Sequence, residues 1–195
     1  MQTINNPILR YPGSKWRIAS WICGYIAQIK HHTYLEPYMG SLAVILNKPP
    51  SPIETVNDID RGIVNLFKVI RDTPDELTRI VEFTPWSRSE YKDILPKSML
   101  AADEDYFIWT GDSLEDARRM LIRCWMSCGA KTSDRSSWAH NVQKQKHGGV
   151  LNCPKRWNRL PEAILKITDR LKLLQIENMP ALDLIQHYQY PEVLN

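Results

Sequence analysis

A single acid follows a short apolar stretch at a spacing typical of nucleoside binding. Asp58 ends the run IETVND at residues 53–58, about twenty residues beyond the turn that contains Gly40. A glycine in such a turn lets a ligand approach the backbone, and the acid accepts hydrogen bonds from ribose hydroxyls. The alternative is a tight turn followed by a helix cap, which uses the same residue types.

Positive charge is concentrated in one part of the chain. Residues 123–159 carry eight Lys or Arg against the single acid Asp134, although the whole chain has a net charge of only +3. Such a block is the electrostatic footprint of a polyanion site. A solvated basic loop is the alternative that charge alone leaves open.

A zinc site is a third kind of chemistry that the composition permits. Its candidate ligands lie within thirty residues: Cys124, Cys128, His140, His147 and Cys153. Cys124 and Cys128 are one helical turn apart, but the combination of a short Cys pair with a compact His pair that common zinc modules have is missing, so buried thiols are the favoured explanation and no metal is expected.

The elements that must position these residues follow from hydrophobic spacing. Residues 32–37 and 53–58 predict two strands, and residues 16–29 and 42–47 predict helices. Strand, turn, helix, strand, acid and helix in this order indicate a parallel α/β sheet. From residue 72 to about 168 the chain reads as helices and loops, with strong helices at 114–125 and 161–174 and an exposed loop or hairpin at 127–158. Strand character returns at 173–177, followed by a short helix at 181–188.

Length and composition set the class. The chain has 195 residues, 43% hydrophobic and 24% charged, with a mean hydropathy of −0.39, which is typical of a globular protein. No run of about eighteen apolar residues or signal-peptide pattern occurs, so neither a membrane partner nor secretion is expected. Four cysteines without regular spacing favour reduced thiols and a cytoplasmic location.

Three motifs, in order, carry a family resemblance. They are LRYPGSK at residues 9–15, YLEPYMGS at 34–41 and NDID at 57–60. They resemble the aromatic-x-Gly-Gly/Ser-Lys, Glu-Pro-Phe-x-Gly-Ser-Gly and Ala-Asp-Ile-Asn motifs of Dam-like DNA adenine methyltransferases. The stretch LQIEN at 174–178 is similar to the strand that precedes the adenine-contacting turn in that family.

The resemblance implies S-adenosylmethionine as cofactor, bound on a Rossmann-like sheet. Tyr11 and Lys15 match positions at the methionine end, where an ammonium suits a carboxylate. Asp58 matches the acid that takes the ribose hydroxyls, and Met179 falls among the adenine-side contacts. The loop after the first strand would wrap the amino acid and ribose through Glu36, Pro37, Tyr38 and Gly40.

The resemblance also implies double-stranded DNA as partner, recognised by an inserted, mostly helical target-recognition subdomain. Predicted domains are residues 1–70 (core, first part), 71–168 (insertion) and 169–195 (return to the core). Trp138 is a candidate for stacking near a displaced base. Candidates for phosphate or base-edge contact are Lys131, Arg135, Lys144, Lys146, Lys155 and Arg156.

Two departures from the family pattern bear on activity. Leu42 stands where the cofactor loop of the family has a second glycine, and no Asp-Pro-Pro-Tyr motif occurs in residues 1–195. That motif polarises and stacks a flipped adenine. We therefore expect an adenine methyltransferase fold, incomplete at its C-terminus, that keeps cofactor and DNA recognition without methyl transfer. The alternatives are a catalytically dead DNA-binding or partner-binding module and, more distantly, another nucleotide-binding protein.

Overall fold

A parallel sheet forms the centre of the fold. The computed structural model describes residues 7–95, 108–128, 137–140 and 153–194. Within them, β1 (Thr33–Glu36), β2 (Ile53–Asn57), β3 (Gln175–Glu177) and β4 (Val193–Leu194) form one sheet in the order β3-β2-β1-β4. Every described pair of neighbouring strands is parallel. The predicted parallel α/β sheet is thus confirmed.

The strand register brings three loops to one edge. Glu36 pairs with Val56, and Asn57 pairs with Glu177. The carboxyl ends of β1, β2 and β3 are therefore level, and the segments that follow them leave the sheet side by side. Ligands of open α/β sheets bind at this edge.

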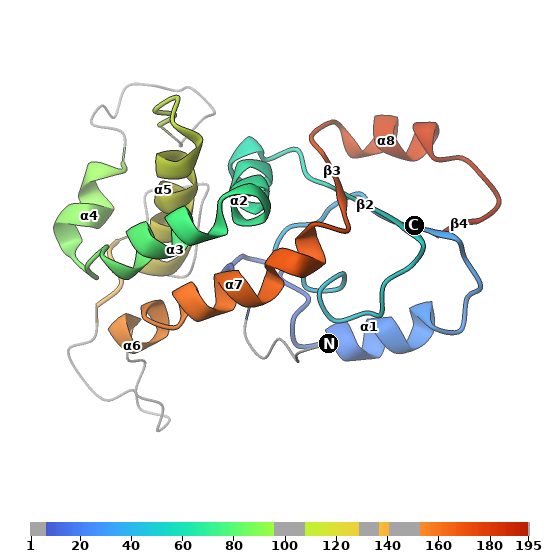
Figure 1. The fold of residues 1–195 in the computed structure, drawn as a ribbon, viewed down its shortest axis with the longest axis horizontal. Coiled ribbons are helices and arrows are strands. Elements are labelled where there is room, and N and C mark those ends of the chain that lie inside the picture. Colours follow the sequence, from blue (N-terminus) through green and yellow to red (C-terminus); the bar gives the residue numbers. More distant parts are fainter. Residues whose placement is uncertain (1–6, 96–107, 129–136, 141–152, 195) are drawn as a thin grey trace.

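Helices surround the sheet unevenly. At one end of the molecule, α1 (Ala19–Ile26) and α8 (Ala181–His187) accompany the strands. At the other end lie α3 (Pro74–Glu82), α4 (Arg88–Asp93), α5 (Ser113–Met126) and α6 (Cys153–Trp157), with α2 (Arg61–Asp72) and α7 (Leu160–Leu171) between the two groups (Figure 1). No helix among the described residues is long and apolar enough to cross a membrane.

One apolar core joins the two ends. Buried Val56 of the sheet, Phe67 of α2, Trp125 of α5 and Ile164 of α7 belong to the same cluster. α2 has a buried apolar face and is capped by Asp60, whose carboxylate accepts hydrogen bonds from Gly62 N and Ile63 N. The helices of residues 71–168 thus share their core with the sheet; the predicted domain boundaries stay a prediction.

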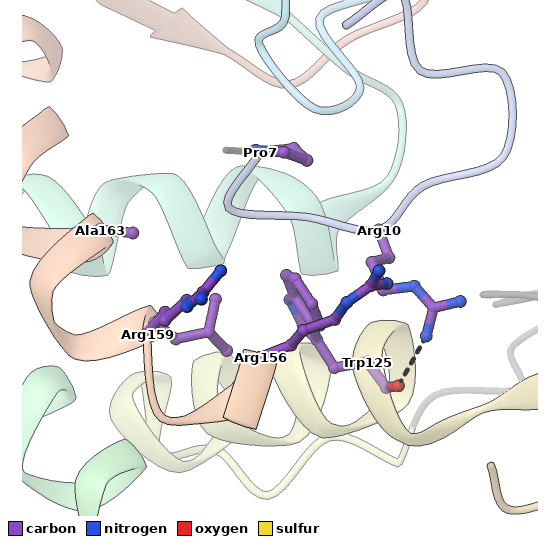
Figure 2. Close-up of a pocket in the computed structure, with 7 residues that line it drawn as sticks. Pro7, Arg10, Trp125, Arg156, Arg159 and Ala163 are labelled. Carbon is purple, nitrogen blue, oxygen red and sulfur yellow. Dashed lines mark hydrogen bonds between the residues drawn. The ribbon is translucent and has the colours of Figure 1, made fainter. Parts of the chain in front are cut away.

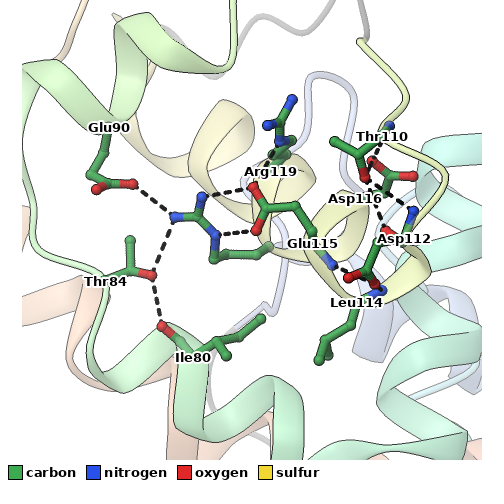
Figure 3. Close-up of polar contacts among 10 residues, drawn as sticks. Ile80, Thr84, Glu90, Thr110, Asp112, Leu114, Glu115, Asp116 and Arg119 are labelled. Carbon is green, nitrogen blue, oxygen red and sulfur yellow. Dashed lines mark hydrogen bonds and ion pairs between the residues drawn. The ribbon is translucent and has the colours of Figure 1, made fainter.

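Polar contacts order the helical end (Figure 3). Arg118 of α5 forms ion pairs with Glu115 on its own helix and with Glu90 of α4, each at 2.7 Å. Asp112 caps α5 by accepting from Leu114 N, and Asp116 accepts from the Thr110 hydroxyl. α4 is thereby tied to the first turns of α5.

The predicted helix at residues 42–47 is wrong. Residues 43–47 form consecutive turns, and only two hydrogen bonds of the helical type occur, from Leu46 N to Leu42 O and from Lys48 N to Val44 O. Leu42 has φ +54°, which a right-handed helix does not allow, and Pro49 ends the segment. Most other predicted helices and strands differ from the structure at their ends, and α1 covers 19–26 within the predicted 16–29. The exposed loop or hairpin predicted at 127–158 is wrong at its end, because residues 153–157 form α6 and bury Cys153 and Trp157.

A buried ion cluster links the sheet to α7. Glu54 of β2 pairs with Lys48 and with Arg170 of α7, each at 2.5 Å, and it also accepts a hydrogen bond from Ser51 N. Arg170 donates to Ile45 O as well. Burial alone would raise the pKa of Glu54, but the hydrogen bonds from Arg170, Lys48 and Ser51 N outweigh burial, so the pKa lies below its ordinary value.

We predict that Arg170→Met lowers the free energy of unfolding by about 3–5 kcal/mol, because removal of one partner leaves a buried charge short of compensation. Urea unfolding followed by tryptophan fluorescence measures this free energy. The control is Lys166→Met, at an exposed position of α7, which should change stability by less than about 0.5 kcal/mol.

The pH dependence of the ion cluster gives a second check. Because the folded pKa of Glu54 is lowered, the stabilisation by its ion pairs is present above the unfolded pKa near 4.5 and is lost as pH falls through the folded pKa. A pH-independent difference between wild type and Arg170→Met would contradict the ion-pair explanation.

Candidate functional site

Asn57 joins the three loops at the carboxyl edge of the sheet. This residue is completely buried at the end of β2. Its Nδ2 donates to Pro37 O and to Met179 O, each at 3.0 Å, while its Oδ1 accepts from Met179 N at 3.0 Å. Its backbone carbonyl accepts from Met39 N at 2.8 Å. The loops after β1 and β3 are therefore both fixed to β2, and they define the edge where a ligand would lie.

Asp58 organises the loop after β1. One of its carboxylate oxygens accepts from Gly40 N at 2.9 Å, and the other accepts from Asp60 N at 3.0 Å. Gly40 has φ +44°, and a Cβ there would come 3.4 Å from the Tyr11 ring, an ordinary van der Waals contact. Glycine at this position is therefore favoured by the left-handed backbone, and the Tyr11 ring packs against it.

Tyr11 lies in a negative environment beside these residues. Burial, followed by the nearby carboxylates of Asp58 and Asp60, raises the pKa of its hydroxyl to about 12. The hydroxyl is thus a neutral hydrogen-bonding group at any physiological pH. Tyr11, Gly40 and Asp58 form one cluster, and Asn57 holds Pro37 and Met179 next to it.

Leu42 keeps the backbone of the loop in a glycine-like conformation. Its φ of +54° falls in the left-handed region, and its N donates to Met39 O at 2.7 Å to close a turn. Its side chain is completely buried in the apolar core. The leucine therefore points into the core, at a backbone cost of about 1–2 kcal/mol.

Other predicted cofactor residues lie apart from this cluster. Lys15 is exposed and donates to Gly13 O at 2.7 Å, and Tyr38 is 73% exposed. The neighbouring Ser14 and Ser41 hydroxyls share a hydrogen bond of 2.7 Å, which joins the turn at Gly13 to the loop after β1. Lys15 thus sits on a turn tied to the cofactor loop, although its ammonium reaches no described acid.

Glu36 faces the protein interior. Burial raises the pKa of its carboxyl to about 8, against the opposing effects of hydrogen bonds from Ile45 N and Tyr34 and of the charge on Lys48. Its Oε2 is buried without a hydrogen-bond partner in the part of the chain that the structure describes. The carboxyl is therefore mostly protonated at neutral pH and retains unused hydrogen-bonding capacity.

The described part of the predicted DNA-binding region carries an aromatic and cationic stack. Trp138 stacks on His140 with ring centroids 5.3 Å apart, and the Arg88 guanidinium lies 5.1 Å from the Trp138 ring. Ser127 and Trp138 form an antiparallel bridge. Such a bridge is typical of a hairpin, one of the two alternatives, loop or hairpin, predicted for residues 127–158. Exposed Lys155 and Arg156 belong to α6. Four candidates lie outside the described residues: Lys131, Arg135, Lys144 and Lys146.

The structure gives no support to a zinc site. Among the described residues, no group of three or more His, Cys, Asp or Glu side chains is placed to hold a metal ion, and His147 lies outside them. All four cysteines are free, and burial raises the pKa of the Cys124 thiol to about 12. A buried, neutral thiol at this position packs in the apolar core.

The parallel sheet and the helices around it define an α/β protein whose three carboxyl-edge loops lie side by side. The model of the D12 class N6 adenine-specific DNA methyltransferase family matches residues 11–133. The chain belongs to this family, which agrees with the resemblance to Dam-like adenine methyltransferases. A comparison with curated proteins gives no match. The three motifs at residues 9–60 lie almost wholly within the matched range.

Two site residues escaped prediction from the sequence. Asn57 was read only as part of the motif at 57–60, although a polar side chain in a buried strand, where the family pattern has alanine, is the available signal. The sequence marks Leu42 as a departure from the family's glycine, which is a signal of its left-handed backbone, but the direction of the leucine side chain depends on the folded loop. Assignment of Tyr11, Lys15, Glu36, Pro37, Tyr38, Gly40, Asp58 and Met179 to cofactor binding stays a prediction.

The left-handed backbone at Leu42 predicts an inverted order of two variants. Leu42→Ala should lose about 2–5 kcal/mol of stability, because it leaves a cavity and keeps the backbone strain. Leu42→Gly should be at least as stable as Leu42→Ala, since glycine adopts φ +54° freely. Urea unfolding of both variants measures this order. The pair Leu66→Ala and Leu66→Gly in α2 is the control, where glycine should be worse by about 1 kcal/mol. The same order at both sites would contradict the proposed role of the backbone at Leu42.

Proposed function

We propose that this chain binds S-adenosylmethionine and double-stranded DNA as an adenine-specific DNA methyltransferase does, and that residues 1–195 alone do not transfer the methyl group. The observation that carries the cofactor assignment is the cluster of Tyr11, Gly40 and Asp58 at the carboxyl edge. Membership of the family supports the DNA substrate, and its members are generally dependent on S-adenosylmethionine.

The residues at this edge fit such a cofactor. Each Asp58 oxygen accepts one backbone hydrogen bond and retains a lone pair, so the carboxylate is held in place and still able to accept from ribose hydroxyls. Gly40 leaves the backbone open to a close ligand. The unpartnered Oε2 of Glu36 marks a buried polar position beside the same loop.

Roles for the remaining residues follow from their chemistry. Tyr11 would lie along the cofactor and offer a neutral hydroxyl, and Lys15 would turn from Gly13 O toward the carboxylate of the methionine part. Met179, held by Asn57, would contact the adenine. The bound cofactor would supply an electrophilic methyl group, and these residues would orient it.

The second part of the proposal concerns catalysis. The Asp-Pro-Pro-Tyr motif that polarises the target amino group is absent from residues 1–195. We assign this role to no described side chain at the carboxyl edge: Asp58 holds the loop after β1 and would take the ribose hydroxyls, and Glu36 Oε2 is a buried atom. The competing candidate, a dead DNA-binding or partner-binding module, shares this absence and differs by having lost cofactor affinity.

We predict that Asp58→Ala weakens binding of S-adenosylmethionine by about 1–3 kcal/mol, the usual effect of losing hydrogen bonds to a charged group. Asp58→Asn, which keeps one oxygen acceptor, should lose less. Isothermal titration calorimetry on residues 1–195 measures both, with Asp75→Ala on the surface of α3 as control. Affinity unchanged in Asp58→Ala would remove this residue from the site, and no binding by wild type would favour the dead module.

We also predict background methyl incorporation by residues 1–195, because no described group polarises the adenine amino group. A tritiated methyl-transfer assay on mixed-sequence duplex DNA tests this, with an active adenine methyltransferase on the same DNA as positive control. Incorporation at adenine above background would locate catalytic groups within these 195 residues and overturn the second part of the proposal.

A further inference from the structure

A pocket of about 300 Å³ opens between the N-terminal segment, α5 and the junction of α6 with α7. Figure 2 shows Arg10 and Arg156 approaching each other over Trp125, with Arg159 on the other side of the opening. None of the residues that line this pocket belongs to the cluster of Tyr11, Gly40 and Asp58. Its lining residues are Pro7, Arg10, Trp125, Arg156, Arg159, Leu160 and Ala163.

The pocket has three cations and no acid in its lining. Arg156 and Arg159 are exposed and form no ion pair within the described residues. Arg10 donates to the Trp125 carbonyl at 3.1 Å and lies 5.9 Å from the centre of the Trp125 ring, and it pairs with no carboxylate among the described residues. By contrast, Arg118 and Arg170 pair with carboxylates. Three guanidinium groups around one cavity, none paired with a described carboxylate, favour an anion as ligand.

The supports of these arginines are rigid. The Trp125 indole donates to Ile8 O at 2.8 Å, and this bond fixes α5 to the segment that carries Arg10. Buried Trp157 ends α6 and donates to Thr84 O at 2.9 Å and to Val81 O at 3.2 Å. Arg156 and Arg159 flank this anchored residue, so the backbone that presents them is held before any ligand arrives, which lowers the entropic cost of binding.

We infer that this pocket holds a backbone phosphate of duplex DNA. Planar guanidinium groups bind phosphate oxygens through paired N–H donors, and phosphate contacts fix the position of a duplex on a protein. Arg10 directly precedes Tyr11, and the Tyr11 ring lies against Gly40 of the loop after β1. The residue that would contact the phosphate is therefore adjacent in sequence to one that contacts the candidate cofactor loop. The inference rests on the proposed function, because it takes DNA as the partner, and it names a contact that this function does not specify.

The test compares two double variants that remove the same charge. Arg156→Gln with Arg159→Gln empties the pocket of two cations. Lys166→Gln with Lys172→Gln removes two exposed cations on and just after α7 that are already paired with Glu162 and Asp169. Circular dichroism and urea unfolding establish that both variants fold, as expected for exposed positions.

Fluorescence anisotropy with a labelled mixed-sequence duplex, at several salt concentrations from 50 to 200 mM KCl, gives the affinities. We expect the pocket variant to bind at least about tenfold more weakly at the lowest salt and to have a salt slope flatter by roughly one to two units, since each phosphate contact contributes about 0.9. The control variant should follow wild type.

Each other outcome has a definite meaning. DNA binding by wild type with no change in the pocket variant overturns the pocket and leaves the proposed function intact. An equal loss in both double variants reflects net charge alone and also overturns the pocket. Failure of wild type to bind any duplex overturns the pocket together with the DNA part of the proposed function. Calorimetry with inorganic pyrophosphate distinguishes the source of the phosphate: pocket-dependent binding of pyrophosphate without any effect on DNA affinity would replace DNA by a free polyphosphate.

Discussion

The hydrogen bonds of one buried amide hold the carboxyl edge together. Asn57 donates to the loops after β1 and β3 and accepts from the loop after β3, and its backbone receives Met39 N. A buried polar side chain is tolerated only when its donors and acceptors form hydrogen bonds. Asn57 therefore requires the loops in these positions, and the loops are in turn held there by Asn57. Asp58 comes directly after Asn57, and its bond to Gly40 N completes the arrangement. The geometry of the candidate cofactor site follows from this single position on β2.

The Glu54 cluster sets the relation between this edge and the helical end. Arg170, near the end of α7, is anchored to Glu54 of β2, whereas Arg159 immediately precedes the first residue of the same helix. A helix of twelve residues is about 18 Å long. α7 therefore connects the sheet, as one continuous helix, to the arginine pocket, the cavity lined by Arg10, Arg156 and Arg159. The shared apolar core reinforces this connection, because Ile164 and Val56 belong to one cluster.

The sequence predicted the parallel α/β sheet, both strands that precede the cofactor loops, and the family, because these depend on local patterns and on ordered motifs. It did not predict features that depend on contacts between distant segments. Arg10 and Arg159 were not singled out, since only the packing of α5 against the N-terminal segment brings them to one pocket. The turns at 43–47 replace the predicted helix at 42–47, because a short run of buried apolar residues has the same composition in either conformation.

The strand order also bears on where a second substrate would meet the cofactor. In an open parallel sheet the crevice opens where the order reverses, which here is between β1 and β4. Leu194 lies beside Tyr34, two positions before Glu36, so β4 runs toward the same edge as the cofactor loop. Arg10 and Tyr11 are consecutive, with Arg10 in the arginine pocket and Tyr11 against Gly40. A duplex held by its phosphate at Arg10 would therefore be positioned relative to the cofactor through two adjacent residues of one backbone segment, because the pocket and the loop after β1 contact neighbouring side chains.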